Sequence, residues 1–177
     1  MQNNTVNWPN MLLVSGTGRD VGKTTFACKL IGSISKNQNT AAIKITPHMH
    51  GQCNSCTIVY KNKNIIVTEE KSTTYDKDSS KMLAAGAQKV YYIQTDDSNI
   101  EKAIAIIKPM IPNNWAVICE SGALRSFIKP GIFVLMSIKN SKNTEKNIDK
   151  IPLADFRFWD YNYKIEDFKF DNGAWVV

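Results

Sequence analysis

The sequence predicts an α/β fold in which a mostly parallel sheet is flanked by helices and accompanied by small β-hairpins. Two observations lead to this prediction. Short apolar segments of strand length alternate along the chain with segments whose apolar residues recur at helical spacing. Strands that alternate with helices form parallel sheets covered on both faces. The length of 177 residues, without an internal repeat or a linker, predicts that residues 1–177 form a single domain.

Each predicted element has a local signal. The strands are short apolar runs at residues 11–15, 41–45, 90–93, 115–119 and 132–138. Helical spacing predicts helices over residues 24–34 and 79–85, and a capping box of Ser98 and Glu101 predicts the start of a third. Residues 57–60 and 65–68 are expected to form one hairpin, and the turn Asp171-Asn172-Gly173 a second one at the C-terminal end. The aromatic residues near this end are interpreted as core or dimer contacts.

Composition excludes several classes of protein. An apolar fraction of 43% and a charged fraction of 21% are typical of a folded globular protein. No apolar run approaches the roughly 20 residues of a membrane helix, and the polar N-terminal segment does not resemble a secretory signal. We therefore expect a cytoplasmic protein without a membrane partner, whose four cysteines are reduced thiols. Cys28 and Cys119 lie in apolar segments and are expected to be inert packing residues.

The net charge of +6 arises from 22 basic and 16 acidic residues. Because the lysines are scattered along the chain and only three arginines are present, the pattern is not that of a nucleic-acid-binding surface. The same charge attracts small phosphorylated ligands, which we consider the better interpretation.

The most specific motif is a glycine-rich loop between the first predicted strand and the first predicted helix. It consists of Gly16, Thr17, Gly18, Arg19, Asp20, Val21, Gly22, Lys23, Thr24 and Thr25. A P-loop needs glycines so that backbone N–H groups can hold phosphate oxygens, a lysine that reaches the β- and γ-phosphates, and a hydroxyl that binds Mg²⁺. These ten residues are therefore predicted to bind a nucleoside triphosphate. The first glycine, Gly16, stands one position earlier than in the usual spacing.

With this displaced glycine the loop is similar to that of dethiobiotin synthetase. The length and layout resemble the molybdopterin-guanine dinucleotide biosynthesis protein B family. Three further segments contribute to the resemblance: residues 43–50 with a lysine and two histidines, residues 76–87, and Glu120-Ser121-Gly122-Ala123. The resemblance covers roughly residues 10–135. It implies a Rossmann-like P-loop NTPase of molybdenum-cofactor biosynthesis, a homodimer, and a molybdopterin-type or other anionic small molecule as second partner.

Charged residues at strand ends complete the candidate catalytic set. Glu120 follows the strand 115–119, and because Mg²⁺ requires oxygen ligands, we predict that Glu120 and Thr24 bind this metal. The resemblance implies the same role for Glu120. Asp20 and Asp78 are further candidates for metal binding or for activating a water molecule. Lys44 ends a strand at the same edge, where it either stabilises charge during phosphoryl transfer, as Lys23 does, or is simply solvated.

A cluster of nitrogen and sulfur ligands lies just beyond the second strand. Both histidines and two cysteines fall within nine residues, at His48, His50, Cys53 and Cys56. Zinc prefers such ligands, so a zinc site is one hypothesis. The alternatives are histidines that contact an anionic substrate, as the resemblance implies, and a polar loop with free thiols.

The predicted function is thus Mg²⁺-dependent binding and hydrolysis of ATP or GTP, with molybdenum-cofactor biosynthesis as the context implied by resemblance. Three alternatives remain open. The first is a metallochaperone NTPase that uses the His/Cys cluster. The second is an ATP-dependent synthetase of the dethiobiotin-synthetase type. The third is a nucleotide-binding module that does not hydrolyse its ligand and whose output is dimerisation or partner docking.

Overall fold

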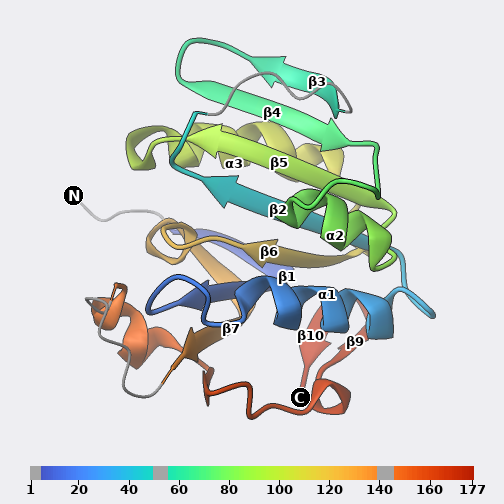
Figure 1. Cartoon of the computed structure of the whole chain (residues 1–177), viewed down its shortest axis with the longest axis vertical. Coiled ribbons are helices and arrows are strands. Elements are labelled where there is room, and N and C mark those ends of the chain that lie inside the picture. Colours follow the sequence, from blue (N-terminus) through green and yellow to red (C-terminus); the bar gives the residue numbers. More distant parts are fainter. Residues whose placement is uncertain (1–4, 50–55, 139–145) are drawn as a thin grey trace.

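A large, mostly parallel sheet lies at the centre of the molecule (Figure 1). The computed structural model describes residues 5–49, 56–138 and 146–177. In these residues the sheet has eight strands, in the order β3 (Cys56–Lys61), β4 (Ile65–Glu70), β5 (Lys89–Thr95), β2 (Thr40–Thr46), β6 (Ala116–Glu120), β1 (Val6–Gly16), β7 (Ile128–Ser137) and β8 (Phe156–Trp159). The six strands from β5 to β8 in this order are parallel, whereas β4 is antiparallel to β5 and β3 to β4. The predicted α/β class is confirmed.

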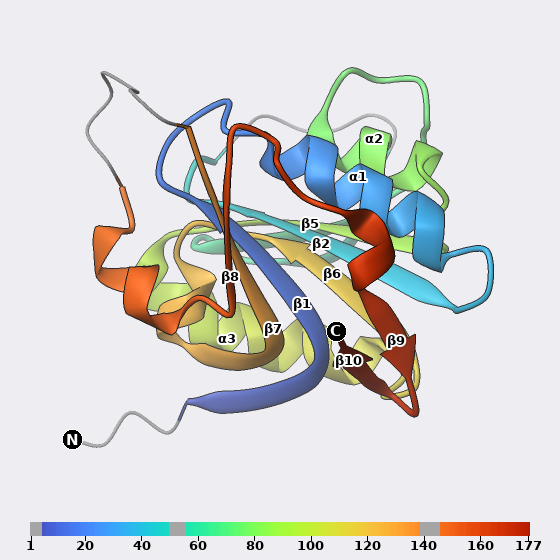
Figure 2. The ribbon, with the colours of Figure 1, turned by 90° about the horizontal axis from the view of Figure 1, so that it is seen from below.

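Helices cover both faces of the sheet (Figure 2). The helices α1 (Lys23–Ile34) and α2 (Asp78–Ala84) lie on one face, and α3 (Ile100–Ile107) lies on the other. The helix α1 buries Phe26, Ala27, Leu30, Ile31 and Ile34, which are the residues whose spacing predicted it. Because both faces are covered, the central strands are largely buried, and a separate apolar core lies on each side of the sheet.

The start of α3 differs from the prediction, because Ser98 and Glu101 do not form its cap. The chain first makes a 3-10 turn, η1 (Asp97–Asn99), which moves the capping position upstream to Asp96. The Asp96 carboxylate accepts a hydrogen bond from the backbone N–H of Asn99 at 3.1 Å, and the Ser98 hydroxyl also donates to it at 2.6 Å. An ionised carboxylate is a stronger acceptor than a hydroxyl, so it takes the free N–H groups of this turn.

Both predicted hairpins are present, one as part of the main sheet and the other outside it. The strands β3 and β4 pair with each other and also extend the main sheet, because β4 pairs with β5. The second hairpin, β9 (Lys169–Asp171) and β10 (Ala174–Val176), forms a sheet of its own. Its turn places Asn172 and Gly173 at φ angles of 49° and 77°, which explains the Asn-Gly pair.

Most of the aromatic residues near the C-terminal end are part of the core, whereas Tyr161 is exposed. The Phe26 ring lies 4.9 Å from that of Tyr163 and 5.5 Å from that of Phe168, measured between ring centroids. Phe168, Phe170 and Trp175 are all buried. This cluster confirms the interpretation as core and joins the C-terminal segment to the face of the sheet that carries α1.

The three cysteines within the described residues do not share one state. Cys28 and Cys119 are free, and burial raises the pKa of Cys28 to about 11 and also raises that of Cys119. Both thiols are therefore protonated and inert at neutral pH, as expected. Cys56 is disulfide-bonded, so the expectation that every cysteine is a reduced thiol is wrong for this residue. That expectation used only the number of cysteines and the N-terminal composition, neither of which describes local pairing.

In the part of the chain that the structure describes, no helix is both long enough and apolar enough to cross a membrane.

Candidate functional site

The glycine-rich loop connects β1 to α1 at the carboxyl edge of the parallel strands. Its first turn stays next to β7, because the Thr17 N–H donates to the Met136 carbonyl at 3.0 Å. The residue before α1, Gly22, has a φ angle of 87°, and its carbonyl accepts a hydrogen bond from the Phe26 N–H at 2.9 Å. A Cβ atom on Gly22 would also collide with the Tyr161 ring. Gly22 is therefore required both by backbone conformation and by space.

The structure explains why the displaced position, residue 16, is a glycine. A Cβ atom on Gly16 would lie 2.5 Å from Val21 Cγ2 and 3.0 Å from Lys23 Cδ. Gly16 thus allows the stem of Lys23 to cross the loop, where Lys23 Nζ donates to the Gly18 carbonyl at 2.8 Å. Burial lowers the pKa of Lys23, although the charge of Glu120 opposes this shift. The Lys23 ammonium group therefore lies over the loop and lines the cavity beside it.

Four predicted residues meet beside the loop. Thr24 Oγ1 donates to one oxygen of Glu120 at 2.8 Å, and Lys44 Nζ lies 2.6 Å from the other. Lys44 Nζ also lies 2.5 Å from Asp78 Oδ2. The register of the sheet places Lys44 of β2 beside Glu120, the last residue of β6, whereas Asp78 is the first residue of α2. Glu120, at 3% side-chain exposure, is nearly removed from water, so its charge needs these partners.

The pKa shifts follow from this pairing. Burial alone would lower the pKa of Lys44, but the charge of Glu120 and the hydrogen bonds to both carboxylates outweigh it and raise the pKa. Burial alone would raise the pKa of Asp78, but the hydrogen bond and charge of Lys44 lower it. At neutral pH Lys44 and Asp78 are therefore ionised in the folded protein.

The lowered pKa of Asp78 predicts how stability depends on pH. The contribution of Asp78 is fully present above its ordinary pKa of 3.8 and is lost as the pH falls through the lower folded-state pKa. We expect the Asp78→Asn variant to be less stable than the wild type at about pH 5, with the gap narrowing towards about pH 2. Urea unfolding of both proteins across this range measures the gap. If the difference in unfolding free energy between the two proteins stays constant with pH, then the pKa of Asp78 is not lowered by folding.

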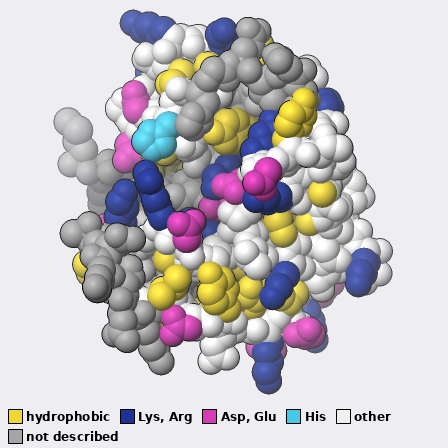
Figure 3. Space-filling view, viewed as in Figure 1, with side chains coloured by type: hydrophobic (Ala, Val, Ile, Leu, Met, Phe, Trp, Pro, Cys, Tyr) yellow, Lys and Arg dark blue, Asp and Glu magenta, His cyan; other side chains and the backbone are white. Residues whose placement is uncertain are grey.

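These residues line a cavity of about 430 Å³. Its lining consists of Arg19, Asp20, Val21, Gly22, Lys23, Thr24, Thr25, Lys44, Asp78, Lys81, Glu120 and Tyr161. Seven of these side chains carry charge, four of them basic and three acidic. Figure 3 shows basic and acidic side chains close together on the face that carries α1 and α2. A cavity with this lining is suited to an anionic ligand that arrives together with a divalent cation.

The proposed zinc cluster is only partly within the described residues. His48 is exposed, and its backbone N–H donates to the Thr46 hydroxyl. His50 and Cys53 lie outside the described residues. The disulfide sulfur of Cys56 has no thiolate charge with which to bind zinc. Within residues 5–49, 56–138 and 146–177, no group of three or more His, Cys, Asp or Glu residues could hold a metal ion.

Sequence reasoning missed Tyr161, which lies against the loop. Its hydroxyl donates to the Asp20 carbonyl at 3.2 Å, and its ring packs on Gly22. Asp160 and Tyr161 have φ angles of 53° and 65°, an uncommon conformation for two successive residues that are not glycine. The sequence places Tyr161 among core aromatic residues, and no local signal separates it from them.

A second missed contact lies beneath the loop. Asn147 Nδ2 donates to the Gly16 carbonyl at 2.9 Å, and Lys150 Nζ donates to the Gly122 carbonyl at 2.5 Å and to the Asn147 side chain at 2.8 Å. These two residues connect the start of the loop to the segment that follows Glu120. Their separation from Gly16 in sequence exceeds 100 residues, so no motif spacing could have indicated the contact.

The arrangement has two chemical capacities. The loop N–H groups and Lys23 can bind an anion, and the oxygens of Thr24, Asp78 and Glu120 can bind a hard divalent cation. Comparison of the chain with protein-family models, with curated proteins and with solved structures found no match.

Proposed function

We propose that this protein is a P-loop NTPase that binds the Mg²⁺ complex of ATP or GTP and hydrolyses the bond between the β- and γ-phosphates. One observation above all supports the proposal. The threonine that follows the loop lysine donates to a buried carboxylate at the end of a neighbouring parallel strand, Thr24 to Glu120 at 2.8 Å. This pairing of a loop hydroxyl with a strand-end carboxylate is the donor set that a Mg²⁺–triphosphate requires.

The residues present fit Mg²⁺. Thr24, Glu120 and Asp78 supply only hard oxygen donors, which Mg²⁺ prefers, and water and phosphate oxygens would complete its coordination. When bound, Mg²⁺ neutralises charge on the phosphate oxygens. These three side chains are therefore the ones that would hold it.

The chain's own residues account for the rest of the proposed reaction. Lys23 and the loop N–H groups that follow Thr17 would bind and orient the phosphates, and Lys23 would stabilise the charge that develops on them. Lys44, which is paired with Asp78 and Glu120, lines the same cavity and would add positive charge near the phosphates. A water oxygen forms a bond to the γ-phosphorus while the bond to the bridging oxygen breaks, which yields a nucleoside diphosphate and inorganic phosphate.

The resemblance described above extends the proposal to molybdenum-cofactor biosynthesis and an anionic second partner. The four basic side chains that line the cavity support an anionic partner. The same cavity would serve an ATP-dependent synthetase, in which an acceptor takes the place of water.

Replacing Lys23 by alanine tests the phosphate site. A hydrogen bond to a charged group contributes about 1.5–3 kcal/mol, so we expect the affinity for Mg²⁺–ATP or Mg²⁺–GTP to fall about 10- to 100-fold. Thermal stabilisation by each nucleotide measures this loss, and the fold should persist because Lys23 is not a core residue. Lys36→Ala, an exposed lysine just beyond α1, is the matched control. Equal stabilisation of the wild type and Lys23→Ala would refute the assigned site.

A further inference from the structure

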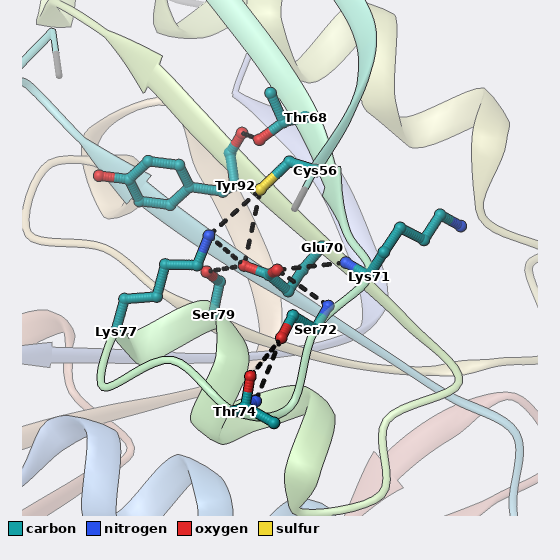
Figure 4. A network of polar contacts seen from close by, with 9 residues as sticks. All are labelled: Cys56, Thr68, Glu70, Lys71, Ser72, Thr74, Lys77, Ser79 and Tyr92. Atoms are coloured by element: carbon teal, nitrogen blue, oxygen red, sulfur yellow. Dashed lines mark hydrogen bonds and ion pairs between the residues drawn. The ribbon is translucent and has the colours of Figure 1, made fainter. Parts of the chain in front are cut away.

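A second buried carboxylate, Glu70, lies outside the cavity and has no role in the proposed chemistry. It is the last residue of β4, and its side chain is fully buried. Figure 4 shows the polar groups that surround it. Lys77 Nζ lies 2.6 Å away, the Ser79 hydroxyl donates at 2.8 Å, and the backbone N–H groups of Lys71 and Ser72 donate at 3.2 and 3.1 Å. Such complete pairing of a buried charge indicates that its position is tightly constrained.

The partners of Glu70 lie on both sides of Asp78 in the sequence. Lys77 precedes Asp78 and Ser79 follows it, and both bind the same Glu70 carboxylate oxygen, Oε2. Asp78 is exposed to about a third, and its own carboxylate reaches Lys44 in the cavity. Glu70 therefore holds the two neighbours of a residue that belongs to the candidate site.

Besides the contacts of Glu70, further contacts hold the start of α2: Lys77 Nζ lies 3.2 Å from Cys56 Sγ, and Asp78 pairs with Lys44 at 2.5 Å. The helix α2 has seven residues, and its N-cap residue, Lys77, makes no capping hydrogen bond with its side chain. The preceding segment, residues 71–77, is largely exposed and connects β4 to this helix. The contacts of Glu70 thus fix both ends of the segment, through Lys71 and Ser72 at one end and Lys77 and Ser79 at the other.

We propose that Glu70 is a positioning residue that fixes Asp78 against Lys44 and thereby sets the affinity of the site for Mg²⁺. This inference rests on the proposed function for its metal, but the placement of Asp78 is a property of the free protein. Residues that orient metal ligands typically change metal affinity 10- to 100-fold when they are replaced. Charge is essential here, because an amide in place of Glu70 would keep the Ser79 contact but would lose the ion pair with Lys77.

The test uses Glu70→Gln with Glu69→Gln as its matched control. Glu69 is the adjacent residue of β4, and its side chain is partly exposed and pairs with Lys71 Nζ at 2.6 Å. The first measurement is a carbon NMR titration of the Asp78 carboxyl group in protein without nucleotide or metal. We expect its pKa to be lowered in the wild type and in Glu69→Gln, and to move towards the ordinary value of 3.8 in Glu70→Gln.

The second measurement is calorimetric binding of ATP and GTP with Mg²⁺ and with EDTA. Mg²⁺ should raise the nucleotide affinity of Glu70→Gln about tenfold less than it raises that of the wild type. The affinity measured in EDTA should be nearly the same for both proteins. The proposal would be overturned if Glu70→Gln changed neither the pKa of Asp78 nor the increase in nucleotide affinity that Mg²⁺ causes. If the wild type binds no nucleotide, the proposed function fails, whereas the Asp78 titration still decides whether Glu70 positions that residue.

Should Glu70→Gln not fold, Ser79→Ala replaces it, because this change removes one contact and leaves the charge of Glu70 paired with Lys77. The same shift in the Asp78 titration is then expected with a smaller amplitude. A titration of Ser79→Ala that coincides with the wild type would count against the proposal.

Discussion

Replacing Glu120 by glutamine is expected to lower the rate of ATP or GTP hydrolysis by about 10³-fold while nucleotide binding is retained. Glutamine keeps the shape of the side chain and an acceptor for Thr24, but it removes the charge that would hold Mg²⁺. A metal ion contributes several kcal/mol to stabilising transferred charge, and each 1.36 kcal/mol corresponds to about tenfold in rate. Single-turnover hydrolysis at saturating nucleotide measures the loss, because it separates the chemical step from binding.

The control for this experiment is Glu101→Gln, because Glu101 is exposed and lies on α3, on the opposite face of the sheet. This variant should hydrolyse nucleotide like the wild type. If Glu120→Gln also hydrolyses at the wild-type rate, then Glu120 is not a metal ligand. If neither the wild type nor the variant exceeds the background rate, the chain is a nucleotide-binding module without hydrolytic activity.

The central part of the fold could be predicted because its signals are local. Each buried parallel strand is a continuous apolar run, and the first helix shows its buried face in the spacing of its apolar residues. The sequence of strand, glycine-rich loop and helix also places Lys23 and Thr24 at one edge of the sheet. Because parallel strands end at a common edge, Lys44 and Glu120 could be expected there too, and the structure brings both within hydrogen-bond distance of each other.

The contacts that complete the site could not be predicted, because they join segments that are distant in the sequence. Tyr161 and Asp20 are 141 residues apart in the sequence, and Lys150 and Gly122 are 28 residues apart with β7 between them. The position of Gly16 has a reason that is visible only in space, since it leaves room for Val21 and for the stem of Lys23. The cap of α3 was mispredicted for a local reason, because a carboxylate two residues upstream competes with Ser98.

Replacing Phe26 by alanine is expected to destabilise the fold by about 3–5 kcal/mol, the range for removing a buried aromatic ring. Phe26 is fully buried, lies one turn into α1 and meets the rings of Phe158, Tyr163 and Phe168 at centroid distances of 5.9, 4.9 and 5.5 Å. Its loss would weaken the packing of α1 against the C-terminal aromatic segment, because Phe26 is the one aromatic residue of α1.

Urea unfolding measures this effect, and Phe26→Leu is the matched control, since it keeps an apolar side chain of similar volume and should cost less than about 1.5 kcal/mol. The melting temperature of Phe26→Ala should fall by about 10 °C, given 2–4 °C for each kcal/mol in a chain of this size. Phe26 does not line the cavity, so the folded fraction should still bind nucleotide. A loss of stability below about 1 kcal/mol would mean that the cavity left by the ring refills, and that the C-terminal aromatic residues do not depend on α1 for their packing.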